Sequence, residues 1–190
     1  FDGGIDPEVY QMLLENEDQP LFPRAIAGEY PSGSTFKPFV ATAALAEGII
    51  STSTTFLSVG GISVGGLWYF PDWRAGGHGV TDVKKAISES VNTFFYIIGG
   101  GYENFTGLGV DRITKYAAMF GFGSPTGLDI PGENDGFLPS KKWKEEAKGE
   151  RWYIGDTYHL AIGQGDVLVT PLQLANAVAT VANGGTRYVP

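Results

Sequence analysis

One stretch near the N-terminus organises the chain, and it reads Tyr30-Pro31-Ser32-Gly33-Ser34-Thr35-Phe36-Lys37-Pro38. Pro31 and Gly33 predict a turn that opens a helix. Apolar residues then recur at helical spacing as far as Leu45. Gly48 predicts the end of this helix, because glycine accepts the left-handed conformation that follows a helix.

Ser34 and Lys37 are three positions apart, so a helix would place them one turn apart on the same face. A serine hydroxyl is a weak nucleophile until a neighbouring base takes its proton. A lysine can be that base when burial lowers its pKa. An ordinary serine near a helix start and a solvent-exposed lysine would show the same spacing, since so short a pattern recurs by accident.

Composition excludes several classes of protein. The chain has 190 residues, which suits one globular domain, and a net charge of −8, which argues against binding to nucleic acid. It has no cysteine, so a cysteine nucleophile, a disulfide framework and a thiolate metal site are all excluded. No apolar run approaches the length of a membrane span, and no signal peptide is visible.

The remaining pattern predicts a mainly helical chain. Residues 49–80 are rich in Gly, Ser and Thr, and a long irregular stretch of this kind is often functional. Within it, residues 67–70 look strand-like. We expect a loop at residues 160–165 and the start of a strand at 186–189. Thr81 is expected to cap the helix at 81–86. The full set of expected helices is 7–15, 34–47, 81–86, 93–98, 110–120, 139–147 and 171–183.

A second motif, Ser90-Val91-Asn92, falls between two predicted helices. Serine and asparagine disfavour helix interiors, so such a junction can aim two polar side chains into a cleft. A hydroxyl can pass a proton on, and an amide can bind a lysine amine and a substrate amide together. The alternative is a structural role, with Ser90 capping the following helix.

Taken together, the two motifs resemble the transpeptidase domain of penicillin-binding proteins, the serine acyltransferases that cross-link peptidoglycan and are inhibited by β-lactams. The spacing is similar to that of the class B, elongation-type members. Further stretches resemble the family as well, and they are Gly127-Leu128-Asp129, residues 152–157, Ile162-Gly163-Gln164-Gly165, residues 170–173 and Asn183-Gly184-Gly185. The resemblance runs nearly end to end and implies an α/β (α+β) fold of the serine transpeptidase and β-lactamase kind.

The resemblance assigns a role to each polar residue of the two motifs. Ser34 would be the acylated nucleophile, and its backbone amide would supply half of an oxyanion hole. Lys37 would deprotonate Ser34, and Ser90 would pass the proton to the leaving group. Asn92 would hold both Lys37 and the peptide amide of the substrate.

The sequence departs from the family in two respects. The family's Lys-Thr-Gly strand is absent, so we expect residues 1–190 to be a partial transpeptidase domain, mostly its helical part with much of the sheet missing. We expect this part alone to be nearly inactive, with the apolar face of the Ser34 helix uncovered. Some elongation-type members bind a metal beside Ser-x-Asn, and Asp72 and His78 match two of its ligand positions. Because Val91 replaces the thiolate, we expect no metal or other cofactor, and Asp72 and His78 exposed in a loop.

The resemblance therefore implies a peptidoglycan DD-transpeptidase whose partners are stem peptides, β-lactams and, in the whole protein, a glycosyltransferase. It places the protein on the periplasmic side of the cytoplasmic membrane, held by a membrane anchor. Two other functions stay open: a DD-carboxypeptidase or serine β-lactamase of the same fold, and a non-catalytic β-lactam sensor.

Overall fold

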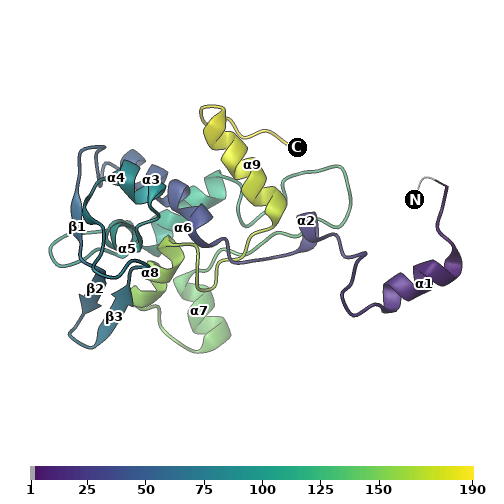
Figure 1. Ribbon diagram of the computed structural model, residues 1–190, viewed down its shortest axis with the longest axis horizontal. Coiled ribbons are helices and arrows are strands. Elements are labelled where there is room, and N and C mark those ends of the chain that lie inside the picture. Colours follow the sequence, from purple (N-terminus) through teal and green to yellow (C-terminus); the bar gives the residue numbers. More distant parts are fainter. Residues whose placement is uncertain (1–2) are drawn as a thin grey trace.

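The computed structural model describes residues 3–190, which combine helices with four short strands (Figure 1). In chain order the elements are α1 (Pro7–Glu15), α2 (Arg24–Ala27), the 3-10 helix η1 (Gly33–Phe36), α3 (Lys37–Ala46), β1 (Phe56–Ser58), β2 (Gly61–Val64), β3 (Trp68–Pro71), β4 (Gly79–Thr81), α4 (Val83–Ser88), α5 (Asn92–Gly100), α6 (Gly109–Met119), α7 (Lys141–Lys148), α8 (Ile154–Ala161) and α9 (Pro171–Ala182). No helix within residues 3–190 has both the length and the apolar character needed to cross a bilayer.

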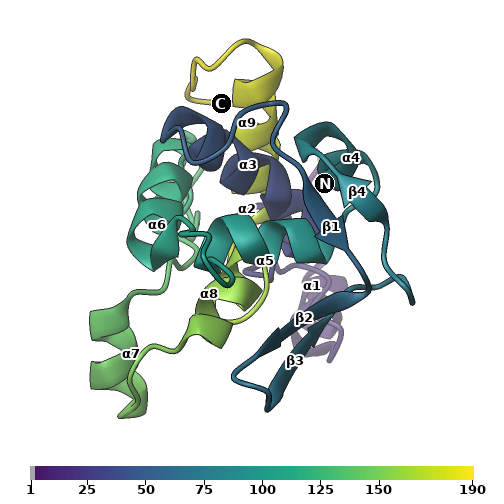
Figure 2. The ribbon, with the colours of Figure 1, turned by 90° about the vertical axis from the view of Figure 1, so that its left-hand side faces the viewer.

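Helix α5 lies at the centre of the body, surrounded by α3, α6 and α8 (Figure 2). Its residues from Thr93 to Gly99 are all buried, as expected for a helix that is apolar on every side. Small residues allow α8 to approach closely, since a Cβ atom on Gly99 would lie 2.4 Å from the Cβ of Ala161. The core therefore forms around the helix that carries Asn92 at its first turn.

Helix α3 packs into this core rather than presenting a bare face. Phe39, Val40, Ala43 and Ala44 are all buried, and the Phe39 ring contacts those of Phe120 and Phe122. The expectation of an uncovered apolar face on this helix is therefore wrong. The aromatic residues that follow α6 supply the missing cover.

The strands form two small antiparallel pairs. β1 pairs with β4, with Phe56 opposite Thr81, and β2 pairs with β3, with Ile62 opposite Phe70. Both pairs arise from the glycine-rich region at residues 49–80. The segment between β3 and β4, residues 72–78, lies against the start of α5.

Several expected boundaries are corrected by the structure. Asp82, not Thr81, caps α4, because its side chain accepts a hydrogen bond from the amide of Lys85. The sequence predicts a loop at residues 160–165, but Leu160 and Ala161 form the end of α8. The first turn of α8 is fixed by a 2.7 Å hydrogen bond from the amide of Tyr153 to the Asp156 carboxylate. Residues 186–190 form no strand, because Asn176 binds the carbonyl of Tyr188 and folds this segment over α9.

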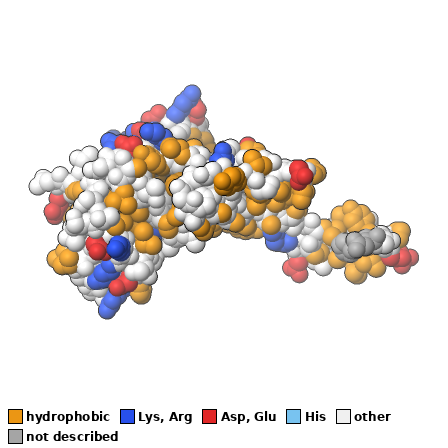
Figure 3. Space-filling model, turned by 90° about the horizontal axis from the view of Figure 1, so that it is seen from above, with side chains coloured by type: hydrophobic (Ala, Val, Ile, Leu, Met, Phe, Trp, Pro, Cys, Tyr) orange, Lys and Arg blue, Asp and Glu red, His pale blue; other side chains and the backbone are white. Residues whose placement is uncertain are grey.

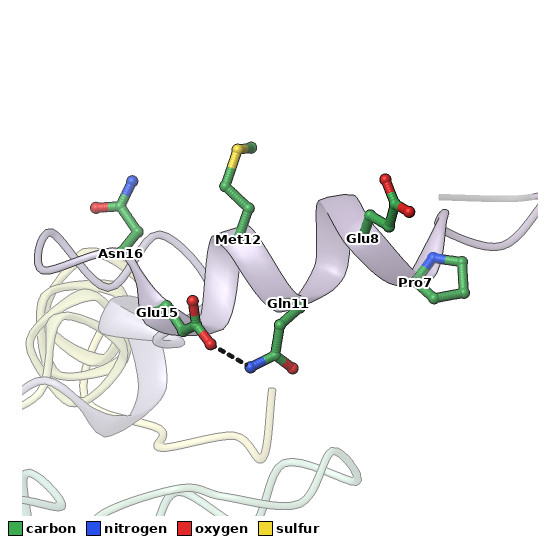
Figure 4. A pocket seen from close by; sticks show the side chains of 6 residues that line it. All are labelled: Pro7, Glu8, Gln11, Met12, Glu15 and Asn16. Carbon is green, nitrogen blue, oxygen red and sulfur yellow. Dashed lines mark hydrogen bonds between the residues drawn. The ribbon is translucent and has the colours of Figure 1, made fainter.

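Helix α1 stands apart from the rest of the structure (Figure 1). It has no buried residue, and hydrophobic side chains gather on its surface (Figure 3). A shallow hollow on it is lined only by residues of its own length and by Asn16, with Gln11 bonded to Glu15 (Figure 4). This hollow contains none of the residues of the two sequence motifs.

Candidate active site

The Ser34 motif adopts a tight helical turn. Ser34 lies in η1, and its carbonyl accepts a hydrogen bond from the amide of Lys37, which begins α3. The Ser34 residue is exposed to solvent, whereas Lys37 is only 1% exposed. The turn thus separates an accessible hydroxyl from a buried amine along one short stretch of chain.

The turn at Gly163 holds this segment in place. The amide of Gly33 donates a 2.7 Å hydrogen bond to the carbonyl of Gly163. A Cβ atom on Gly163 would lie 2.1 Å from the Gly33 carbonyl oxygen and 2.7 Å from the Cβ of Phe36. Gly163 also has a φ of +70°, which side chains rarely adopt. The Ile162-Gly163-Gln164-Gly165 stretch is therefore a backbone support for the serine segment.

The buried amine of Lys37 joins the two sequence motifs. Its Nζ lies 2.9 Å from the hydroxyl oxygen of Ser90, 2.8 Å from the Ser90 carbonyl oxygen and 2.6 Å from Oδ1 of Asn92. Three acceptors match the three protons of an ammonium group. A neutral amine would keep two of these donors and gain a lone pair that can accept a proton.

Burial lowers the pKa of Lys37 from its ordinary value to about 8, although the nearby charge of Asp72 acts in the opposite direction. The Phe95 ring lies 5.5 Å from Nζ and supplies a further stabilising contact for the charged form. A pKa near 8 leaves a useful fraction of neutral amine at physiological pH. Lys37 is therefore suited to act as a general base.

The Ser90 junction is a sharp break between α4 and α5. Ser90 adopts a left-handed conformation with φ of 55°, and Val91 behind it is completely buried. Val91 occupies the N-cap position of α5, with no side-chain bond of its own. Ser90 does not cap the helix, so the structural alternative for this serine is wrong. Its hydroxyl faces Lys37 instead.

Sequence reasoning missed the function of Asp72 and misplaced both Asp72 and His78. Both side chains are fully buried rather than exposed. The Asp72 carboxylate accepts hydrogen bonds from the amides of Asn92 and Thr93, the first two of α5. The sequence around Asp72 gave no signal that its carboxylate binds the start of α5, because the amide of Asn92 lies 20 positions away in the chain.

The residues around His78 do not fit a zinc ion. His78 Nε2 lies 3.6 Å from Oδ1 of Asp72 and has no hydrogen-bond partner among the residues described. The oxygens of Asp72 are already engaged by backbone amides, and Val91 offers no donor atom. Within residues 3–190 no three His, Cys, Asp or Glu residues are grouped to hold a metal, whereas zinc sites provide three or four protein ligands.

A cavity of about 440 Å³ opens beside Asn92. Its walls come from the β3 strand, the segment that follows it, α5, α8 and the turn after α8, and they include Trp68, Trp73, Tyr96, His159 and Gln164. Trp68 and Trp73 are more than half exposed, so they are not core packing residues. The cavity gives an elongated ligand a place to lie next to the Asn92 amide.

An exposed serine, a buried lysine and a Ser-x-Asn turn together form the arrangement of a serine acyltransferase. Comparison with known proteins agrees, because residues 6–190 match the family model described as the penicillin binding protein transpeptidase domain. The chain belongs to this family.

Curated relatives are named peptidoglycan D,D-transpeptidase MrdA. The protein from Acinetobacter baumannii is 40% identical over 191 residues, which cover 100% of this chain and 28% of the relative. The protein from Salmonella typhimurium is 41% identical, again over the whole chain and 30% of the relative. The chain thus spans less than a third of the length of these relatives.

Solved structures confirm the expected fold class. Pseudomonas aeruginosa PBP2, in complex with WCK 5153, superposes with a TM-score of 0.89 at 36% identity over 98% of this chain and 41% of that one. Helicobacter pylori PBP2, in a complex with MreC, gives a TM-score of 0.87 at 35% identity over 98% of this chain and 34% of that one.

Proposed function

We propose that this chain is part of a peptidoglycan DD-transpeptidase, and that residues 1–190 form a portion of its transpeptidase domain. The observation that carries the proposal is the contact of the buried Lys37 amine with Ser90 and Asn92, one turn from an exposed Ser34. The names of the relatives support the same activity.

The first half-reaction forms an ester on Ser34. Neutral Lys37 accepts the hydroxyl proton while the Ser34 oxygen attacks the carbonyl carbon of a D-Ala-D-Ala terminus. The amide C–N bond then breaks, and the proton passes from Lys37 through the Ser90 hydroxyl to the departing D-alanine amine. The short Lys37–Ser90 contact of 2.9 Å supports this route.

The second half-reaction transfers the acyl group. The amine of an acceptor stem peptide attacks the ester carbonyl and gives a proton to the base, the ester C–O bond to Ser34 breaks, and the base returns the proton to the Ser34 oxygen. A β-lactam follows the first half-reaction, but opening of its ring leaves no separate leaving group. Asn92, in the wall of the cavity, would hold the peptide amide of the donor while Oδ1 binds Lys37.

The setting of the whole protein is also part of the proposal. We infer that it faces the periplasm, is anchored in the cytoplasmic membrane and works beside a glycosyltransferase. Two solved relatives support partner binding: one is a PBP2 bound to MreC, and the other belongs to a peptidoglycan synthase complex that coordinates polymerization and crosslinking.

The test uses the whole protein with polymerised peptidoglycan carrying a labelled pentapeptide donor. We expect cross-linked dimers as the main product, and loss of this product in Ser34→Ala. Release of D-alanine without dimers would favour a carboxypeptidase. Rapid turnover of penicillin would favour a β-lactamase, and stable acylation with neither product would favour a sensor.

A further inference from the structure

We propose that Asp72, Trp73 and His78 act as a clamp that positions the Ser90-Val91-Asn92 turn, and through it the Lys37 amine. This inference rests on the proposed function, because acylation is its readout. The three clamp residues lie in the segment between β3 and β4. They are positioning residues, since among the described residues the hydrogen bonds of Lys37 go to Ser90 and Asn92 and not to the clamp.

Asp72 holds the side of the turn that leads into α5. Its Oδ1 accepts a 3.2 Å bond from the amide of Asn92, and its Oδ2 accepts a 2.9 Å bond from the amide of Thr93. The first amides of a helix have no partner within the helix. Val91 provides no side-chain cap for α5. Asp72 is therefore the cap of α5, supplied from elsewhere in the chain.

The Asp72 carboxylate is kept charged in its buried place. Burial alone would raise the pKa of Asp72, but bonds from Thr93, Asn92 and the amide of Trp73 outweigh it, and the pKa lies below its ordinary value. A charged acceptor at a helix N-terminus is also favoured by the helix dipole. The same charge opposes the larger lowering of the Lys37 pKa by burial.

Trp73 and His78 hold the opposite side of the turn. The indole Nε1 of Trp73 donates a 3.0 Å bond to the carbonyl of Glu89, the residue before Ser90. His78 Nδ1 lies 2.8 Å from the Glu89 carboxylate. The two rings pack edge to face at 5.1 Å, so they support each other. Together with Asp72 they fix the chain immediately before and after Ser90.

The clamp is itself anchored to the body. The Ser58 hydroxyl donates to Asp72 and accepts from the amide of His78. Lys85 on α4 binds the His78 carbonyl at 2.5 Å. Ser90 needs such support because its left-handed conformation is unfavourable for a residue with a side chain. The clamp thus supplies the constraint that the turn does not provide for itself.

A matched pair of tryptophan variants tests the clamp in the whole protein. Trp73→Phe keeps an aromatic ring but removes the indole donor, whereas Trp143→Phe makes the same change on α7, outside the cavity walls, where no hydrogen bond among the described residues involves the indole. Trp73 is exposed and Trp143 is only partly buried, and both variants keep an aromatic ring, so both are expected to fold. We expect Trp73→Phe to slow penicillin acylation about 3- to 10-fold, the size of effect typical of one hydrogen bond, and Trp143→Phe to leave it unchanged.

Asp72→Asn provides a second readout that simple destabilisation would not move. Loss of the charge should slow acylation about 10- to 100-fold. It should also lower the pKa of Lys37, so the acid limb of the pH–rate profile moves to lower pH. A variant that is only less folded would lose rate equally at every pH.

The outcomes are distinct. If the unaltered protein is not acylated, the proposed function fails. If it is acylated but Trp73→Phe matches Trp143→Phe, or Asp72→Asn leaves the acid limb in place, the clamp is wrong.

Discussion

Lys37 and Asn92 are 55 positions apart in the chain, yet Nζ of the first lies 2.6 Å from Oδ1 of the second. This contact joins the helix that follows Ser34 to the helix at the centre of the core. Both helices are held by apolar packing, so the polar contact is placed by the core rather than by flexible side chains. The core thus fixes the position of the amine before a substrate arrives.

Replacement of Lys37 by methionine should nearly abolish acylation by penicillin. General base catalysis contributes about 10²–10⁴ in rate, and methionine keeps the length of the side chain without the amine. The measurement is the rate of acylation by a fluorescent penicillin. Lys144→Met is the control, because Lys144 is also buried but binds Asp156, and acylation per folded molecule should survive there. Equal losses in both variants would show that burial of a lysine, and not its chemistry at position 37, is what matters.

The rate of acylation should rise with pH up to about 8. Lys37 is protonated below its pKa of about 8 and must be neutral to act as a base, so the rate falls as pH decreases through this value. Asn92→Asp places a negative charge against the amine, favours the charged form and should shift the acid limb to higher pH. Asn104→Asp makes the same change in an exposed turn and should leave the limb in place. An unshifted limb in Asn92→Asp would argue that another group is titrating.

Gly163→Ala should disturb the serine segment. A Cβ atom there meets the Gly33 carbonyl, and positive φ alone costs about 1–2 kcal/mol for a residue with a side chain. Gly66→Ala is the control, because Gly66 has the same φ of +70° in open space between β2 and β3. Thermal unfolding and acylation rate should both suffer more in Gly163→Ala. Equal effects would mean that the close approach to Gly33 is unimportant.

Removal of metal should change nothing. Asp72 is engaged by backbone amides and Val91 has no donor atom, so dialysis against a chelator should leave the melting temperature and the acylation rate unaltered. The melting temperature and the acylation rate are measured before and after dialysis, and the zinc content of the dialysed protein is measured by elemental analysis. Stoichiometric zinc in the dialysed protein would show that His78 and Asp72 recruit further ligands.

The two motifs could be recognised from the sequence because the residues of each motif lie close together in the chain. Ser34 and Lys37 sit one turn apart, and the polar residues at 90 and 92 interrupt two apolar patterns, so spacing alone brings out the chemistry. The resemblance to a known family then assigned the residues to one site. Helix ends at Gly48 and Pro171 were also predictable, since glycine and proline restrict the backbone directly.

The clamp and α8 were not predictable in the same way. Asp72 caps a helix that begins 20 residues later, and this depends on how the segment after β3 folds back. Helix α8 begins with Ile154-Gly155, which weakens its helical pattern, and its capping aspartate comes three residues after Tyr153. Contacts between distant segments decide both features, and local propensity does not encode them.

The position of the penicillin adduct in the whole protein tests the assignment of Ser34 as the nucleophile most directly. Protein treated with penicillin is digested, and the modified peptide is identified by mass spectrometry. We expect one adduct, on Ser34, that is lost in Ser34→Ala and kept in Ser32→Ala, where a neighbouring hydroxyl is removed. An adduct on any other residue, or one that persists in Ser34→Ala, would contradict the account.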